Sequence, residues 1–217
     1  NEISYRKNGN SFTVTNYVNY INNFIFDRPS GVGRFFWGPG PTYIFDQSDA
    51  LFVGADITYS APLTDNLKGT FGGSYLWSQN IERNELLINQ PPINLNAELA
   101  WQTPSFLGLD YSKLTLSTGY TFRQFQAPRK IAPELLDGQE ENGEVQITLE
   151  SEIFDFKDEP EGYFLTNMLW EWKWRGFGGQ VEIRNALNTV YRDYLNQMRL
   201  FADELGRNFL ISLNYTF

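Results

Sequence analysis

The chain has 217 residues, a formal net charge of −9, no cysteine and no histidine. The acidic balance argues against a nucleic-acid partner, because no basic stripe is available to neutralise phosphates. The lack of cysteine excludes a disulfide framework. No apolar run approaches the roughly 18 residues of a membrane-spanning helix, the longest being of the Ala50–Val53 kind. Membrane-spanning strands remain possible, because they need be apolar on one face only.

Apolar and polar residues alternate with a period of two along much of the chain, which is the pattern of β-strands. The alternation predicts about nine strands, counting a partial first one. They cover approximately residues 2–5, 11–26, 51–60, 67–77, 93–102, 114–123, 164–174, 180–187 and 209–217. One face of these strands is rich in large aromatic residues, and the other carries charged and amide side chains. The same alternation fits a soluble β-sandwich or a membrane barrel.

The last strand ends the chain on an aromatic residue, Phe217. A membrane barrel has reason for this, because its last strand closes against another strand and carries an aromatic at the membrane edge. The alternative is an ordinary edge strand of a soluble sandwich. The apolar positions of this strand are Phe209, Ile211, Leu213, Tyr215 and Phe217.

The connections between these strands alternate in length. Short ones lie at 6–10, 62–66, 104–112 and 175–178, and long ones at 27–42, 79–92, 127–161 and 188–206. Short turns at one rim and long loops at the other are typical of outer-membrane barrels. Aromatics agree with two interfacial girdles, although ordinary cross-strand pairing would also explain them. Trp101, Trp172 and Trp174 precede short turns, and Tyr75, Trp77, Tyr120 and Phe122 approach long loops.

Several motifs then occur in a fixed order. Val181–Leu195 contains Asn185-Ala186-Leu187-Asn188 and Tyr191-Arg192, and Gly206-Arg207-Asn208-Phe209 opens the last strand. Together with Asp49–Asp56, Pro91-Pro92 and Glu161–Asn167, this order resembles TonB-dependent outer-membrane receptors. The family usually has Leu-Phe at Ala186-Leu187, Pro at Leu205 and Glu at Asp56.

The resemblance implies an all-β fold, an antiparallel transmembrane β-barrel of 22 strands whose lumen holds an N-terminal plug. Residues 1–217 would be the C-terminal portion of that barrel, beginning at about its fourteenth strand. The implied partners are outer-membrane lipid, the remaining N-terminal barrel and plug, and a TonB-type periplasmic energiser. The implied place is the outer membrane of a Gram-negative bacterium. The implied function is active import of a scarce nutrient, with a ferric siderophore, an anionic ferric chelate, as substrate.

The sequence offers little catalytic chemistry. Without histidine or cysteine, there is no Ser-His or Cys-His nucleophile and no imidazole or thiolate metal site. We therefore expect no enzyme, no catalytic residue, no metal and no cofactor. An acidic stretch favours a solvated loop over a calcium site, since it lacks Asp-x-Asp-x-Asp-Gly spacing. Its members are Glu150, Glu152, Asp155, Asp158, Glu159 and Glu161.

Candidate ligand-binding residues lie in the long loops, where the family resemblance places substrate capture. The aromatic cluster Phe35-Phe36-Trp37 could stack on a flat ligand or pack against another loop. The basic residues could attract an anionic chelate, bind lipopolysaccharide phosphates or pair with carboxylates. The basic candidates are Arg34, Arg83, Arg129 and Lys130, with Arg192 also near the outer loops.

A further group of residues is expected to be structural. Tyr191, Arg192, Arg207 and Phe217 would hold the last loop and close the barrel. Four lumen-facing charges are expected to pair with one another and with the plug. These charges are Glu98, Arg123, Glu182 and Arg184.

Three rival functions remain open from the sequence. A glycan importer of the same family would suit the aromatic loop cluster. A soluble β-sandwich binding module, such as a lectin-like domain, would fit the alternation. An outer-membrane enzyme is disfavoured by the absence of histidine.

Overall fold

The computed structural model describes residues 1–34, 40–127, 129–130, 140–141, 144–146, 154–155 and 159–216. Of these, 29–34, 40–42, 129–130, 140–141, 144–146, 154–155 and 200 are described by their backbone alone. Nine strands have six or more residues. They are β1 (Glu2–Lys7), β2 (Asn10–Arg34), β3 (Gly40–Pro62), β4 (Leu67–Asn80), β6 (Asn94–Thr103), β7 (Tyr111–Thr121), β12 (Tyr163–Trp174), β13 (Phe177–Arg184) and β14 (Asn208–Tyr215).

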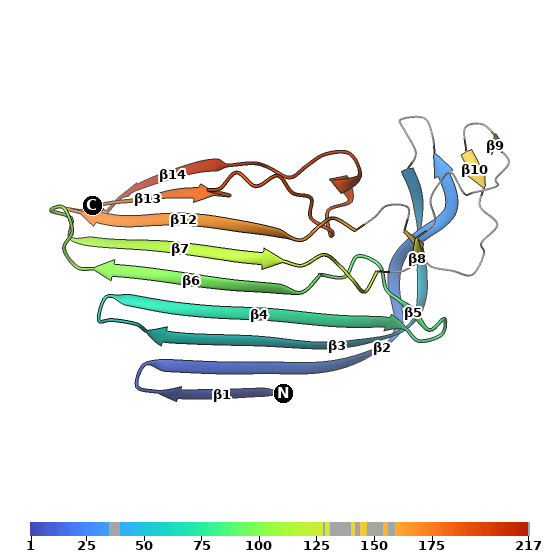
Figure 1. Ribbon diagram of the computed structural model, residues 1–217, viewed down its shortest axis with the longest axis horizontal. Helices are drawn as coiled ribbons and strands as arrows, with labels where there is room; N and C mark the ends of the chain where they lie inside the picture. Colours follow the sequence, from blue (N-terminus) through green and yellow to red (C-terminus); the bar gives the residue numbers. More distant parts are fainter. Residues whose placement is uncertain are drawn as a thin grey trace.

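These strands form one antiparallel sheet in the order β14-β13-β12-β7-β6-β4-β3-β2, with β1 paired to β2 (Figure 1). Neighbours in the chain are therefore neighbours in the sheet. The all-β antiparallel fold expected from the sequence is confirmed. No helix within the described residues is long and apolar enough to span a bilayer. The shorter elements are β5 (Glu85–Leu86), β8 (Arg129–Lys130), β9 (Glu140–Glu141), β10 (Glu144–Gln146), β11 (Phe154–Asp155) and the 3-10 helix η2 (Gln197–Leu200).

The strand register sorts side chains onto two faces. Leu99 of β6 lies opposite Leu116 of β7, which in turn lies opposite Met168 of β12. One residue along, Glu98 pairs with Ser117. Because side chains alternate along a strand, apolar residues from all nine strands share one face and polar residues the other. We call these the apolar face and the polar face.

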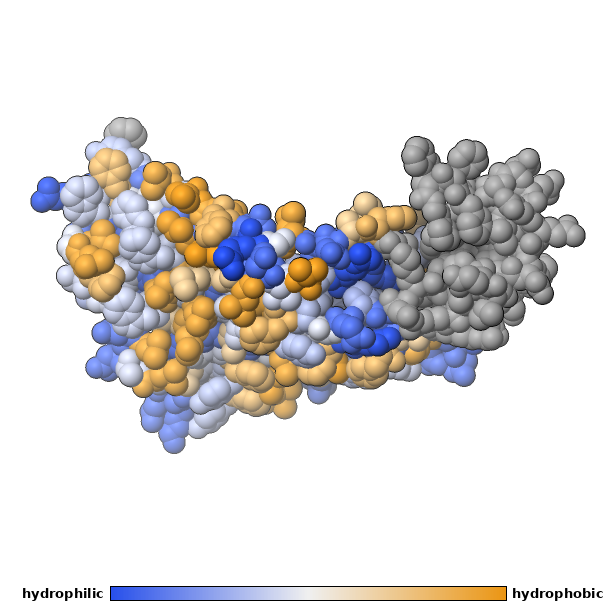
Figure 2. Space-filling view, turned by 45° about the horizontal axis from the view of Figure 1, so that its top comes forward, coloured by the Kyte–Doolittle hydropathy of each residue, from blue (hydrophilic) through white to orange (hydrophobic). Residues whose placement is uncertain are grey.

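The apolar face is exposed to a degree that a packed core would not allow. Leu99 and Leu116 are 44% and 40% exposed, and Leu213 is 74% exposed. Figure 2 shows apolar side chains on the surface of the strands. The described residues contain no second sheet packed on this face. A soluble sandwich would bury these positions between two sheets.

The two ends of the strands differ, as the sequence predicts. At one end β1–β2 and β12–β13 are joined by two-residue turns, Asn8-Gly9 and Arg175-Gly176. All four of these residues have positive φ, from 45° to 86°, which is the type I′ conformation that suits the twist of a hairpin. At the other end lie the long connections. We call these ends the turn end and the loop end.

The predicted loop over 27–42 is wrong in part, because β2 runs to Arg34 and β3 begins at Gly40. The strands continue past a β-bulge between Ile21 and Phe24. Asp49 holds that bulge, accepting hydrogen bonds from the Asn23 N–H at 3.0 Å and the Tyr20 hydroxyl at 2.6 Å. Bulges bend strands, and beyond this point β2 and β3 leave the direction of the other strands (Figure 1). Pro29 and the nearby glycines read as a loop, but pairing with β3 supplies the backbone hydrogen bonds.

Candidate functional site

The candidate site lies at the loop end, where the connection between β4 and β6 folds back on the sheet. Leu87 and Ile88 of this connection are 1% and 6% exposed and pack against Phe26 and Ala50. Ala50 lies opposite Asn80 of β4. Its side chain is on the face of β3 that carries polar residues nearer the turn end. This small apolar cluster fixes the connection against β2 and β3, and a polar group lies beside it.

That polar group is an ion cluster of Arg28, Asp46 and Arg83. The Asp46 Oδ2 atom accepts from Arg28 Nε at 2.6 Å and from Arg83 NH2 at 2.9 Å. The three side chains are 17%, 24% and 29% exposed, respectively. Burial alone would raise the pKa of Asp46, but hydrogen bonds from Arg28 and the Gln47 N–H and the two guanidinium charges outweigh it and lower the pKa. The two guanidinium groups therefore share one carboxylate oxygen.

Three buried polar atoms on β4 and its turn have no hydrogen-bond partner among the residues that the structure describes. They are Ser78 Oγ, Asn80 Nδ2 and Arg83 NH1. Ser78 and Asn80 are 3% and 0% exposed, and Asn80 Oδ1 accepts the Arg83 backbone N–H at 3.2 Å. Unpaired buried polar atoms cost free energy. All three can donate, so this end has hydrogen-bond donors to spare for an oxygen-rich group.

The structure places the predicted ligand residues unevenly. Arg83 belongs to the ion cluster described above. Arg34 ends β2, where its backbone pairs with Gly40 and Glu144. Arg129 and Lys130 form β8, paired in parallel with Phe154 and Asp155, and the side chains of Arg34, Arg129 and Lys130 are not described. Phe35, Phe36 and Trp37 lie outside the described residues, as does Phe217.

The acidic stretch is described in part. Glu159 and Glu161 both pair with Arg123, at 3.4 Å and 2.7 Å. Asp155 is described by its backbone in β11, whereas Glu150, Glu152 and Asp158 lie outside the described residues. Within the described part of the chain, no three Asp or Glu side chains gather to hold a metal.

The expected pairing among lumen charges is confirmed in one case. Arg184 Nε lies 2.7 Å from Glu182 Oε1 on the same strand. Arg123 pairs instead with Glu159 and Glu161, because it lies past the end of β7, where the acidic connection returns to the sheet.

The residues expected to hold the last loop lie in a folded segment, 185–207. The Tyr191 ring packs on Tyr163 with centroids 4.4 Å apart, and burial, with the charges of Glu204 and Asp193, raises the pKa of Tyr191. Arg192 Nε lies 2.6 Å from Asp203 Oδ1. The role of these residues in barrel closure stays a prediction.

Arg207 lies at the end of the same segment. Its backbone N–H donates to Asn188 Oδ1 at 2.9 Å. This bond joins the two ends of the segment where they meet the sheet. Barrel closure through Arg207 likewise stays a prediction.

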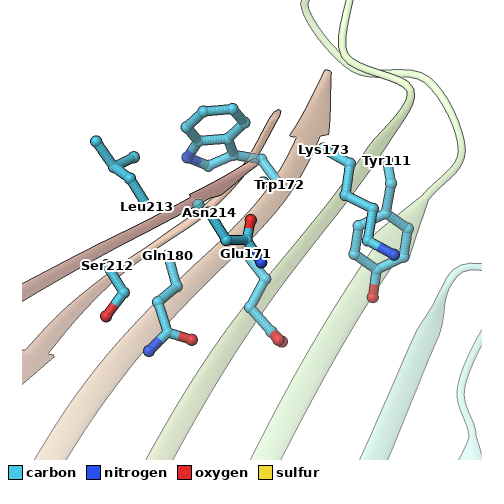
Figure 3. Close-up of a pocket in the computed structure, with 10 residues that line it drawn as sticks. Tyr111, Glu171, Trp172, Lys173, Gln180, Ser212, Leu213 and Asn214 are labelled. Carbon is cyan, nitrogen blue, oxygen red and sulfur yellow. The ribbon is translucent and has the colours of Figure 1, made fainter. Parts of the chain in front are cut away.

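The polar face is hollowed near the turn end. One hollow of about 240 Å³ lies over β12, β13 and β14, with Glu171, Gln180 and Ser212 among its lining residues. Figure 3 shows these three side chains on one side of the strands, with Trp172 and Leu213 on the other. Gly178 leaves room for the Asn214 side chain, because a Cβ there would lie 2.1 Å from the Asn214 Oδ1 atom. A second hollow of about 730 Å³ extends over β4, β6 and β7.

Sequence reasoning missed several residues of the loop end. Arg28 was read as part of a loop and Asp46 was passed over. Asp46 pairs with Arg28, 18 positions away, and with Arg83, 37 positions away. Asp27 Oδ2 accepts from Asn89 Nδ2 at 3.1 Å and from Gln197 Nε2 at 3.4 Å. No local pattern signals these contacts, because the hydrogen bond between Asp27 and Gln197 joins residues 170 positions apart.

No family model matches the chain. No curated protein matches it either. Several solved structures match the chain in fold. The copper transporter OprC has a TM-score of 0.71 and 17% identity, over 99% of this chain and 30% of OprC.

A mutant of the ferric enterobactin receptor PfeA from Pseudomonas aeruginosa has a TM-score of 0.63 and 18% identity, over 98% of this chain and 30% of PfeA. The pyoverdine outer membrane receptor FpvA from Pseudomonas aeruginosa PAO1 has a TM-score of 0.59 and 13% identity, over 100% of this chain and 29% of FpvA. None of the three is named as an enzyme, in line with the expectation from the sequence.

The chain spans about 30% of the length of these proteins. Likeness at this identity concerns the fold, and the fold is shared along almost the whole chain. This chain has the fold of a portion of the β-barrel of TonB-dependent outer-membrane receptors.

Proposed function

We propose that residues 1–217 are the C-terminal portion of the barrel of an active transporter in the outer membrane of a Gram-negative bacterium. The transporter imports a scarce nutrient, and its substrate is a ferric siderophore. The remaining barrel strands and the plug come from outside these residues. A TonB-type protein energises import from the periplasmic side by pulling on the plug.

The apolar face is the observation that carries this proposal. Side chains such as Leu99, Leu116 and Leu213 are exposed in a continuous sheet whose other face is polar. Burying an apolar side chain is worth about 1.5–3 kcal/mol, so an uncovered face of this kind is costly in water. Lipid removes that cost, and closure of the strands into a barrel satisfies the backbone.

The ion cluster supports an anionic substrate. Arg28 and Arg83 share the Asp46 carboxylate, and within the described residues Arg83 NH1, Ser78 Oγ and Asn80 Nδ2 are buried donors without a partner. Guanidinium groups bind oxyanions through paired, charge-assisted hydrogen bonds. PfeA and FpvA are named for ferric enterobactin and pyoverdine, which makes ferric chelates the first substrates to test.

The polar face supports a plug in the lumen. Lys68 and Glu98 line the larger hollow, and within the described residues neither has an ion-pair partner. A protein surface bearing complementary charges would pair with them. The hollows would then be filled by protein rather than by a small ligand.

Uptake of radioactive iron tests this function. The bacterium that carries the complete gene is given iron as a catecholate chelate, a hydroxamate chelate or ferric citrate, with a copper salt and an oligosaccharide as other cargo. We expect energy-dependent uptake of one ferric chelate, lost on deletion of the gene. Uptake of the oligosaccharide alone would favour the glycan importer, and no change for any cargo would contradict import.

Arg83→Ala sharpens the test of the site. Loss of a charge-assisted hydrogen bond costs about 1.5–3 kcal/mol, so we expect half-saturation at a chelate concentration about tenfold higher or more. Arg175→Ala, in a turn at the opposite end, is the matched control and leaves uptake unchanged.

A further inference from the structure

The segment between β13 and β14, residues 185–207, is a folded lobe rather than an open loop. Arg192 joins its two legs, donating to Asp203 at 2.6 Å and to the Arg199 carbonyl at 2.8 Å. The Glu204 N–H donates to the Tyr191 carbonyl at 2.9 Å. These bonds cross-link the outgoing and returning legs of the lobe.

Tyr194 and Arg199 give the lobe a small interior. They are 4% and 6% exposed, and the Arg199 guanidinium lies 4.7 Å from the Tyr194 ring centroid. The tip is the 3-10 helix η2, which Asn196 caps by accepting from the Met198 N–H. A compact tip of this kind can make a defined contact.

The base of the lobe is a pair of asparagine turns. Asn185 is 4% exposed and exchanges two hydrogen bonds of 2.8 Å with Thr189, and its N–H donates to Asn167. Asn188 accepts from the Arg207 N–H at 2.9 Å. Asn185 and Asn188 both have positive φ, 49° and 56°, which asparagine adopts more readily than most residues. The lobe therefore meets the sheet at two short, well-defined turns.

The tip reaches the far side of the sheet. Gln197 donates to Asp27 Oδ2 at 3.4 Å, and the same oxygen accepts from Asn89 at 3.1 Å. In the sheet, β12, β7, β6, β4 and β3 all lie between β13 and β2. The lobe therefore bridges the curved sheet at the loop end, where Asp27 joins it to β2 and to the connection after β4.

We propose that residues 185–207 are a lid across the loop end, latched to β2 by the Asp27–Gln197 contact, and that release of the latch admits the substrate. The lid rests on the proposed transport function for its purpose but not for its existence. A hydrogen bond of 3.4 Å between exposed groups is long, which suits a contact that must open and close. The rigid legs and the two asparagine turns define what moves and where it turns.

Spin-label distances test the lid without any substrate. The sequence contains no cysteine, so Ile25→Cys and Met198→Cys, at positions 63% and 58% exposed, label both sides of the latch and leave it intact. In the complete outer-membrane protein we expect one short, narrow distance population. Adding Gln197→Ala shifts the main peak to longer distances and broadens it, whereas Leu205→Ala, on an exposed position of the same lobe, leaves it unchanged.

A broad, long distribution in the unmodified pair overturns the lid, and so does an identical distribution with Gln197→Ala. Gating is tested with the same two cysteines joined by a short, reducible thiol linker. Joining them should abolish uptake of the ferric chelate, and dithiothreitol should restore it. Undiminished uptake by the joined protein overturns the gate. Failure of the unjoined protein to take up any cargo counts against the transport function, while the spin-label distances still decide the lid.

Discussion

The sheet of nine long strands, which we call the strand wall, and the loop end of this chain are built by different means. In the wall, Leu116 lies between Leu99 and Met168, and each neighbour follows from a simple register. At the loop end, Asp27 is joined to Gln197 across five strands. The wall derives its two faces from a period of two, and the loop end derives its shape from polar contacts between distant residues. Substitutions in the two regions should therefore affect the stability of the protein in different ways.

The largest effect should come from a charge on the apolar face. Leu116→Arg places a cation where we propose lipid, at a cost of roughly 2–4 kcal/mol near the bilayer midplane. Ser117→Arg, one residue along, faces the polar side beside Glu98 and should be tolerated. Denaturant titration of the barrel folded into vesicles measures both. Equal losses for the two variants would contradict the assignment of faces.

The next effect concerns the lid alone. Asn185→Ala removes the hydrogen bonds to Thr189, which lowers local stability by about 1–3 kcal/mol. Asn185→Asp keeps an acceptor for the Thr189 N–H and should lose less. Hydrogen exchange should quicken at residues 186–207 and stay constant in β7. Quickened exchange throughout β7 would show that the two regions are not separable.

A third effect is pH-dependent and belongs to the ion cluster. The lowered pKa of Asp46 means that its charged form is favoured in the folded protein. Its stabilising contribution is therefore complete above the ordinary Asp pKa of about 3.9 and is lost as the pH falls through the lowered value. A spin label on Phe45→Cys, an 84% exposed position, should stay ordered at neutral pH and loosen in acid. With Asp46→Asn, the label should be mobile at every pH. An unchanged acid transition in that variant would mean that another group causes the transition.

The smallest effect should come from a turn. Arg175 has a φ of 45° in a two-residue turn before Gly176. Asn adopts this conformation more readily, so Arg175→Asn should stabilise the hairpin by about 0.4–1 kcal/mol. Thermal unfolding in detergent measures the gain. The other two-residue turn of this chain, Asn8-Gly9, already has asparagine at the corresponding position. A loss of stability would show that the contact between Arg175 and the Trp174 ring outweighs the turn preference.

The wall was predictable from the sequence because its information is local. Alternation in β7 and β12 fixes which residues face together, and short turns with positive-φ residues fix which strands pair. The hairpin of β2 and β3 escaped prediction beyond Phe26, because a bulge at Asn22-Asn23 breaks the period and Pro29 reads as a breaker.

The site was predictable only in kind. Basic residues in long loops pointed to the loop end, and Arg83 does lie there. Its partners Arg28 and Asp46 depend on how the bent hairpin meets the connection after β4, and no sequence period encodes that meeting. The contact between Asp27 and Gln197 is still harder to predict from local sequence, since it depends on the curvature of the whole sheet.

The central claim is that the apolar face meets lipid and the polar face meets the lumen. Single cysteines at each position from 113 to 118, in a chain that otherwise lacks cysteine, would carry a fluorophore in vesicles containing a lipid-borne quencher. We expect quenching at Leu114, Leu116 and Thr118 and little at Lys113, Thr115 and Ser117. Equal and weak quenching at all six, with full access to a water-soluble quencher, would contradict it.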